Sequence, residues 1–119
     1  MSAAKFGLDN LVAILDANGG QIDGSLAEVM PSEEPLAAKW EAFGWAVREI
    51  PGHDFGAILD AYAWAQARDS KPKLILARTE KGHGVSFVVH PTKYHGVALT
   101  DDELTRALAE LGVDGEVKS

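Results

Sequence analysis

The sequence predicts an α/β fold in which a parallel sheet of about three strands is flanked by helices. Two observations indicate this class. Three short apolar runs alternate along the chain with helix-period patterns, which is the sequence form of a layered α/β unit. Two of these runs are continuously apolar, as is typical of parallel strands that are covered on both faces.

The first predicted strand covers residues 11–15, and we expect it to be fully buried because every residue in the run is apolar. A helix is predicted over residues 35–43 by three apolar side chains that share one face: Leu36, Trp40 and Phe43. Glu33 and Glu34 suit the positive end of this helix, and Gly44 is expected to end it.

A second strand is predicted over residues 46–50, nearer an edge of the sheet because it is less apolar, and Pro51-Gly52 then turns the chain. Asp54 is the predicted N-cap of a helix that we expect to end by residues 69–70. The predicted buried stripe of this helix consists of Phe55, Ile58, Leu59 and Tyr62. The third strand, residues 74–77, is continuously apolar and is expected to be covered on both faces.

Residues 80–99 form the longest segment without periodicity, and such a segment within a compact domain is usually functional or disordered. Thr100 and Glu103 form a capping box for a last helix, which has apolar positions at Leu104, Leu108 and Leu111 and ends at Gly112. We interpret residues 1–119 as one domain with a loose tail at residues 113–119.

The composition is that of an ordinary globular protein, with 46% hydrophobic and 24% charged residues. The net charge of −7 argues against a nucleic-acid partner, because phosphate binding needs clustered Lys and Arg. Without cysteine there is no disulfide, thiolate metal site or thiol nucleophile. No apolar run approaches the ~18 residues that span a bilayer, so we expect no membrane association and a cytoplasmic location.

Asn18 lies just beyond the first predicted strand and is followed by two glycines. Ligands of open α/β sheets bind beyond the carboxyl ends of the strands, and glycines let the backbone approach a ligand closely. Asn18 is therefore a candidate ligand-binding residue, with an ordinary Asn-Gly turn as the alternative. Asp16 and Asp23 are likewise either metal ligands or turn-forming side chains.

A second glycine loop, Lys81-Gly82-His83-Gly84, follows the third predicted strand and should emerge at the same edge of the sheet. Its cation, imidazole and backbone N–H groups suit a phosphate or diphosphate, while a plain loop fits the same residues. His95 is either a surface histidine or one that donates to an anion or moves a proton. The spacing of His90 and His95 matches no zinc pattern.

Several segments occur together in one order along the chain. They are Leu8-Asp9-Asn10-Leu11, Asp16-Ala17-Asn18-Gly19, Gln21-Ile22-Asp23-Gly24, Glu28-Val29-Met30-Pro31, Lys39-Trp40, Ala42-Phe43-Gly44-Trp45, Gly52-His53-Asp54, Lys81-Gly82-His83-Gly84-Val85-Ser86-Phe87 and Tyr94-His95-Gly96. Together, over about residues 5–111, they resemble the later half of the diphosphate-binding domain of transketolase, as found in the N-terminal subunit when that enzyme is split.

The resemblance implies a thiamine-diphosphate-binding fold, here a partial doubly wound parallel sheet lacking the family's first strand-helix unit. It also implies thiamine diphosphate held through Mg or Ca, and transfer of a two-carbon ketol unit from a ketose phosphate to an aldose phosphate, as in the pentose phosphate pathway. Asn18 matches the family's metal-binding asparagine and Gly20 its backbone carbonyl donor. Ile22 matches the apolar residue against the cofactor, Lys81 the loop lysine on the cofactor side, and His95 the histidine near diphosphate and substrate, which makes it the catalytic candidate.

The chain departs from the family's pattern because it has no Gly-Asp-Gly, the motif whose aspartate is the first metal ligand. The resemblance therefore implies a truncated N-terminal subunit, inactive alone and completed by an upstream segment and a C-terminal, pyrimidine-domain subunit in a dimeric assembly. It also implies an exposed sheet edge that is prone to pairing. The alternatives are a non-catalytic α/β module for assembly or regulation, and a truncated gene or misplaced start codon. The related deoxyxylulose phosphate synthase shares the strand-end asparagine and the Lys-Gly-x-Gly segment, but the stretches at residues 21–24 and 39–45 favour transketolase.

Overall fold

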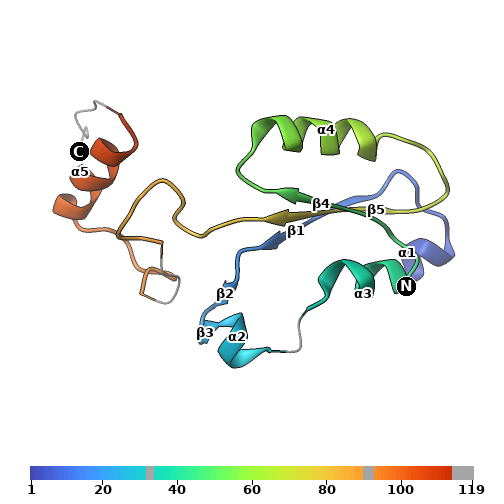
Figure 1. Cartoon of the computed structure of the whole chain (residues 1–119), viewed down its shortest axis with the longest axis horizontal. Coiled ribbons are helices and arrows are strands. Elements are labelled where there is room, and N and C mark those ends of the chain that lie inside the picture. Colours follow the sequence, from blue (N-terminus) through green and yellow to red (C-terminus); the bar gives the residue numbers. More distant parts are fainter. Residues whose placement is uncertain (32–33, 90–92, 114–119) are drawn as a thin grey trace. The chain divides into compact units, whose positions relative to one another are not determined.

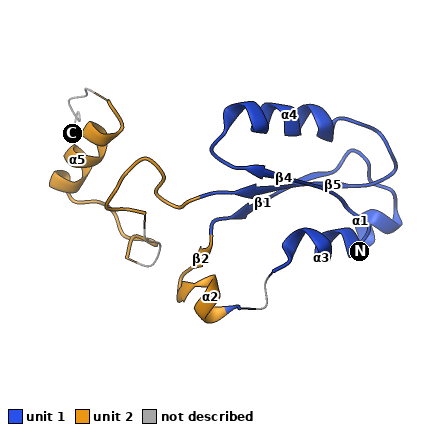
Figure 2. Cartoon of the chain, in the orientation of Figure 1, with its two compact units in different colours: residues 1–18, 30–79 blue, residues 19–29, 80–119 orange. Residues whose placement is uncertain are grey.

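The computed structural model describes residues 1–31, 34–89 and 93–113. Their contacts group the chain into two compact units, which are described separately below (Figure 2). The first unit contains residues 1–18 and 30–79, and the second contains residues 19–29 and 80–119. No helix in the described ranges is long and apolar enough to cross a membrane. The interpretation of the whole chain as one domain stays a prediction.

A three-stranded parallel sheet forms the centre of the first unit (Figure 1). Its strands are β1 (Val12–Ala17), β5 (Lys73–Arg78) and β4 (Ala46–Pro51), in the order β1-β5-β4. In the register, Arg78 pairs with Ala17 on one side and with Pro51 on the other, so all three strands end at the same edge. The predicted α/β class with a parallel sheet is confirmed.

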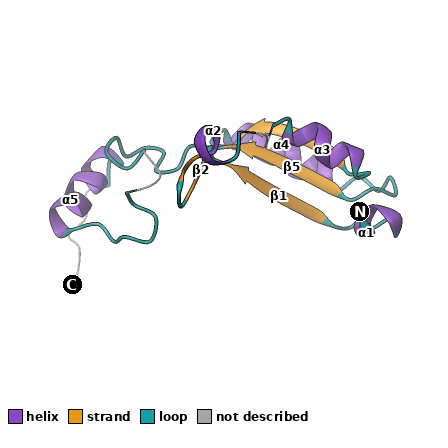
Figure 3. Ribbon diagram, turned by 90° about the horizontal axis from the view of Figure 1, so that it is seen from below, coloured by secondary structure: helices purple, strands orange, loops and turns teal. Residues whose placement is uncertain are grey.

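Among the described elements, two helices cover the sheet, one on each face, but they leave one of its three strands uncovered. The short α1 (Ser2–Lys5) precedes β1, α3 (Leu36–Ala42) precedes β4, and α4 (Phe55–Ala65) connects β4 to β5. Figures 1 and 3 place α3 and α4 on opposite faces, and neither helix overlies β1. β5, which has a strand on each side, is therefore buried from Lys73 to Ala77, as predicted for the third strand.

The prediction of a fully buried first strand is wrong. β1 alternates between exposed and half-buried residues, and Ile14 is 56% exposed. The reason is its position in the sheet. Within the described residues β1 has one neighbouring strand and no covering helix, and a run of apolar residues does not reveal how many neighbours a strand has. β4 lies at the opposite edge of the sheet, and this edge position confirms the prediction for the less apolar second strand.

The predicted buried stripe of α4 is wrong for three of its four residues, whereas the fourth, Ile58, is half-buried and packs against the core. Phe55, Leu59 and Tyr62 are 81%, 68% and 46% exposed, while Ala61 and Ala65 are the buried residues of the helix. Small side chains let α4 lie close to the sheet, where Ala61 and Ala65 join a core cluster with residues of β4 and β5: Ile50, Ile75 and Ala77. α4 ends at Ala65, earlier than the predicted residues 69–70.

The predicted helix boundaries around α3 and α4 are otherwise confirmed. Asp54 caps α4, since its Oδ1 accepts a hydrogen bond from the Ala57 N–H at 3.0 Å. Glu34 Oε2 accepts from the Leu36 N–H at 2.9 Å at the start of α3, and Gly44 with φ 87° follows its end. Glu33 lies outside the described residues. Leu36 is buried as predicted, whereas Phe43 is 51% exposed because it follows the last helical residue.

The described residues of the second unit include a small hairpin, the short helix α2 and the longer helix α5. The hairpin pairs β2 (Gly20–Gln21) with β3 (Gly24–Ser25), and α2 (Leu26–Val29) follows it. α5 (Asp101–Glu110) begins at the predicted capping box of Thr100 and Glu103, and Gly112 with φ 67° follows it. The described part of residues 80–99 has no helix or strand, as predicted. Of the predicted tail, only Val113 lies within the described ranges.

Candidate functional site

In the first unit, polar side chains meet at the edge where β1 and β5 end. The Asp16 carboxylate accepts hydrogen bonds from Asn18 Nδ2, at 3.2 Å, and from the Thr79 hydroxyl. Asp16 therefore joins the ends of two neighbouring strands and holds the amide side of Asn18. Because a carboxylate only accepts, the nitrogen of the carboxamide faces Asp16 and its oxygen points away.

An apolar cavity of about 220 Å³ lies on one face of the same sheet. Asp16 and Thr79 line it together with Gly52, and its remaining lining is apolar: Ile14, Ile50, Ile58, Tyr62, Ile75 and Ala77. Gly52 follows β4 and donates its N–H to the Arg78 carbonyl at 2.7 Å. A Cβ at Gly52 would collide with the Thr79 methyl, so the strand ends pack tightly at this point.

Arg78 forms a charged cluster at the ends of the strands. Its Nε donates to Glu49 Oε1 at 2.8 Å, and its Nη1 donates to Glu34. The hydrogen bond from Arg78 is the main cause that lowers the pKa of Glu34, and the two carboxylates raise the pKa of Arg78. This cluster has no local signal in the sequence, because Glu34 precedes α3, Glu49 lies in β4 and Arg78 lies in β5.

In the second unit, two of the predicted site residues are in contact. Lys81 Nζ and His95 Nδ1 are 3.1 Å apart, although 14 positions separate them in the sequence. Lysine only donates hydrogen bonds, so His95 Nδ1 accepts and its Nε2 carries the proton. The pair therefore presents an ammonium and an imidazole N–H together, which suits an anion such as a phosphate.

The glycine loop that carries Lys81 is tightly folded. Gly82 has φ +78° and lies so close to the backbone of Val88 that a Cβ would be 2.7 Å from its carbonyl carbon. The Val85 N–H donates to the Gly82 carbonyl at 3.0 Å, and His83 Nδ1 lies 3.2 Å from Glu80 Oε2. His83 thus interacts with a carboxylate within its own loop, and glycine at position 82 is required by both conformation and space.

The other predicted residues of the second unit lie in and near its hairpin. Gly20 is in β2, paired with Ser25, and the Leu26 N–H donates to the Gly19 carbonyl at 3.0 Å. Ile22 is 64% exposed in the turn of the hairpin. Across residues 1–31, 34–89 and 93–113, no three His, Asp or Glu side chains are gathered as a metal site would require. His90 lies outside these ranges.

Comparisons with known proteins decide the family. The model of the family described as "Transketolase, thiamine diphosphate binding domain" matches residues 1–118. The chain belongs to this transketolase family.

Named relatives of this transketolase chain include a 6-deoxy-6-sulfo-D-fructose transketolase subunit from Clostridium sp. (strain MSTE9), 43% identical over 108 residues, which are 91% of this chain and 39% of the relative. An apulose-4-phosphate transketolase subunit from Actinobacillus succinogenes is 37% identical over 111 residues, which are 93% of this chain and 40% of that subunit. The chain thus spans about 40% of the length of these relatives.

Solved structures also resemble this transketolase chain. Transketolase from Leishmania mexicana superposes with a TM-score of 0.78 and 29% identity, over 95% of this chain and 17% of that one. Transketolase from Campylobacter jejuni superposes with a TM-score of 0.73 and 28% identity, over 95% of this chain and 18% of that one. The fold class and the family resemblance inferred from the sequence are therefore confirmed.

Proposed function

We propose that this chain forms part of the cofactor site of a thiamine-diphosphate- and magnesium-dependent transketolase. In this proposal the enzyme transfers a two-carbon ketol unit from a ketose phosphate to an aldose phosphate, within cytoplasmic carbohydrate metabolism such as the pentose phosphate pathway. The observation that best supports it is the 3.1 Å contact between Lys81 of the glycine loop and His95, which places an ammonium beside an imidazole in a chain from the thiamine diphosphate binding family.

The proposed metal ligands are the Asn18 side chain and the Gly20 carbonyl. Both are oxygen donors, and an all-oxygen set suits magnesium or calcium. The hydrogen bond from Asn18 Nδ2 to Asp16 fits this role, because it orients the carboxamide so that the oxygen faces away from the carboxylate. The remaining ligands would come from the diphosphate and from an aspartate of a Gly-Asp-Gly motif, which this sequence does not contain.

The proposed cofactor contacts come from three further residues. Lys81 would neutralise diphosphate charge, Ile22 would pack against the cofactor, and His95 would donate from Nε2 to the diphosphate or to the substrate phosphate. Thiamine diphosphate, when bound, supplies the carbon chemistry that breaks and forms the C–C bond. This chain's residues would bind and orient it, and His95 is the proposed residue that holds or moves a proton near the substrate.

We further propose that the enzyme is completed by other polypeptide, namely the rest of the diphosphate-binding domain and a pyrimidine-binding, C-terminal subunit, in a dimeric assembly. Relatives that are named as transketolase subunits support a divided enzyme. The names of the relatives give different sugars, 6-deoxy-6-sulfo-D-fructose, which carries a sulfonate, and apulose-4-phosphate, so they do not choose one sugar for this chain. We propose sugar phosphates as the substrate class.

Calorimetry of thiamine diphosphate binding, with and without Mg²⁺, tests the proposed cofactor site. We expect Mg²⁺ to strengthen binding to the wild-type chain, Asn18→Ala to abolish this effect of Mg²⁺, and Lys81→Met to weaken binding both with and without the metal. Asn10→Ala is the matched control, because it removes an exposed carboxamide elsewhere. Binding that Mg²⁺ does not change, or that Asn10→Ala weakens as much as Asn18→Ala, would contradict the proposal.

A complementation assay tests the proposed reaction. The chain is co-expressed with the remaining segment of the diphosphate-binding domain and with a pyrimidine-domain subunit, both taken from a related transketolase. We expect Mg²⁺-dependent ketol transfer by the mixture and none by the chain alone. Turnover by the chain alone would contradict the proposal that other polypeptide completes the enzyme. No turnover from the mixture, with Asn18→Ala still binding its partners, would favour a non-catalytic assembly module instead.

A further inference from the structure

One face of α5 contacts the loop that carries the Lys81–His95 pair. Four helical residues spaced as one face form it together with the C-cap residue Leu111: Glu103, Arg106, Ala107 and Glu110. Ala107 is buried on this face, and so is Val85 in the loop. At the end of the face, a Cβ at Gly84 would lie 3.0 Å from Leu111 Cδ2, so the loop backbone lies close to the helix there.

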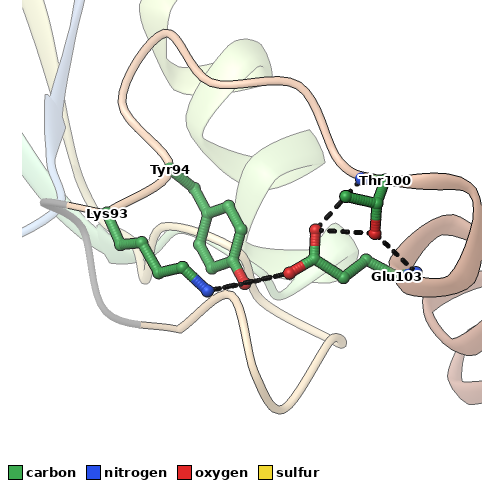
Figure 4. Close-up of polar contacts among 4 residues, drawn as sticks. All are labelled: Lys93, Tyr94, Thr100 and Glu103. Atoms are coloured by element: carbon green, nitrogen blue, oxygen red, sulfur yellow. Dashed lines mark hydrogen bonds and ion pairs between the residues drawn. The ribbon is translucent and has the colours of Figure 1, made fainter.

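The first end of the α5 face is joined to the residue that precedes His95. The Tyr94 hydroxyl donates to Glu103 Oε1 at 3.0 Å, while Glu103 Oε2 accepts from the Thr100 N–H at 3.0 Å (Figure 4). These hydrogen bonds, led by the one from the Thr100 backbone, lower the pKa of Glu103. Lys93 Nζ lies 3.0 Å from the Tyr94 hydroxyl and adds a cation to the cluster. Glu103 therefore serves both as the helix cap and as the anchor of Tyr94.

The other end of the face is joined to the residues that follow Lys81. Glu110 accepts hydrogen bonds from both the N–H and the hydroxyl of Ser86, the latter at 2.8 Å. Between the two ends, the Arg106 guanidinium lies 4.4 Å from the centre of the Phe87 ring. Phe87 in turn contacts Tyr94 edge to face, with ring centroids 6.3 Å apart. The two anchors, Ser86 and Tyr94, are thus connected through the side chains between them.

These contacts fix the loop near both members of the Lys81–His95 pair. Ser86 lies five residues after Lys81, and Tyr94 directly precedes His95. We propose that α5, through the pairs Glu103–Tyr94 and Glu110–Ser86, positions Lys81 and His95 for a diphosphate-like anion. This inference rests on the proposed function of the Lys81–His95 pair and adds Ser86, Tyr94, Glu103 and Glu110 to it as positioning residues.

The physical reason is pre-organisation. An anion that binds a mobile loop must order both the loop and the two side chains, whereas a loop already fixed on a helix leaves less freedom to be lost. Positioning therefore raises affinity without any contact between α5 and the anion. It also predicts that a weakened anchor changes the environment of His95 before any ligand is added.

Calorimetry with inorganic diphosphate provides the first test, on the whole chain. Tyr94→Phe removes the hydroxyl bound to Glu103 but keeps the ring, and Ser86→Ala removes the hydroxyl bound to Glu110 but keeps the N–H. We expect each to weaken diphosphate binding about fivefold, the change that corresponds to one lost hydrogen bond of about 1 kcal/mol. Thr105→Val is the control, because the Thr105 hydroxyl donates to Asp101 within α5 itself. It should leave the affinity unchanged.

Nitrogen NMR of the His95 ring provides the second test and needs no ligand. In the wild-type chain, Nδ1 accepts from Lys81, so the Nε2–H tautomer should dominate. Tyr94→Phe and Ser86→Ala should shift the ring toward the tautomer mixture of a free histidine, while Thr105→Val should not. Helical content measured by circular dichroism should stay the same in all three, which separates positioning from loss of α5.

The two tests distinguish the positioning role from the proposed function. A tautomer shift in the two anchor variants with no diphosphate binding by the wild type supports positioning and counts against the anion site. Diphosphate binding that neither variant weakens, with an unchanged His95 tautomer, overturns the positioning role and leaves the anion site standing. Equal effects of Thr105→Val and Tyr94→Phe also overturn it.

Discussion

Tight packing at the strand ends predicts a specific cost for Gly52→Ala. The added Cβ would collide with the Thr79 methyl and lie 3.0 Å from the Arg78 carbonyl oxygen. Thr79 is not free to rotate away, because its hydroxyl donates to Asp16. Overpacking of this kind costs about 1–3 kcal/mol, and alanine recovers about 0.4–1 kcal/mol by restricting the unfolded chain. We therefore expect the free energy of unfolding of the first unit to fall by about 1–2 kcal/mol.

A second substitution decides whether the Thr79 methyl is the cause. Thr79→Ser removes that methyl and keeps the hydroxyl for Asp16, so alone it should cost less than about 0.8 kcal/mol, the value for one buried methylene. Combined with Gly52→Ala it should restore about 1 kcal/mol, within the range of coupling between residues in contact. Thr79→Val keeps a methyl at the same branch and loses the hydroxyl, and it should restore nothing.

Urea unfolding followed by tryptophan fluorescence measures these effects. All three tryptophans, Trp40, Trp45 and Trp64, belong to the first unit and report its unfolding. Strictly additive costs for Gly52→Ala and Thr79→Ser would refute the reasoning, because the steric conflict would then not involve this methyl. Restoration of stability by Thr79→Val would refute it as well.

Two further predictions concern glycine conformation and acid stability. Gly82 and Gly96 have nearly the same φ, +78° and +77°, but only Gly82 has described atoms within 4 Å of an added Cβ. Gly82→Ala should therefore speed amide hydrogen exchange at Val85 and Val88 much more than Gly96→Ala, and equal effects would show that the backbone angle alone matters. The hydrogen bond from buried Lys73 is the first cause that lowers the pKa of Asp69 below 3.8. The stabilisation from this hydrogen bond is complete above the pH range in which an ordinary aspartate titrates, and it is lost as the pH falls through the lowered pKa of Asp69. Asp69→Asn should therefore destabilise the chain at pH 7, and the urea midpoint should then change less with pH on the acid side. A parallel downward shift of that profile at every pH would contradict the assignment.

Much of the fold could be predicted because the signals were local. β5 has a continuous apolar run, the cap of α4 is read from Asp54, and the cap of α5 is read from Thr100 and Glu103. The buried face of α4 could not be predicted in this way, because the helix has two apolar stripes. Phe55, Leu59 and Tyr62 form the more hydrophobic stripe, but the alanine stripe allows a closer approach to the sheet and is the one that is buried. The hydrophobicity of the side chains alone therefore does not predict which face is buried: the large side chains that offer more contact area, or the small ones that let the helix pack closer to the sheet.

Some residues of the candidate site could likewise be predicted from the local sequence, whereas others depend on contacts between distant segments. Asn18, Lys81 and His95 could be proposed from their places after strands and within glycine loops. The side chains that hold Asn18 in place depend instead on how β1 and β5 are paired. Asp16 pairs with Ala77, and Thr79 lies two residues further along the chain from Ala77, on the same face because side chains alternate along a strand. A shift of one residue in the β1–β5 register would carry Asp16 to the opposite face and separate it from Thr79. The contact between Asp16 and Thr79, which are 63 positions apart, thus ties the orientation of Asn18 to the pairing of two strands, which no local motif contains.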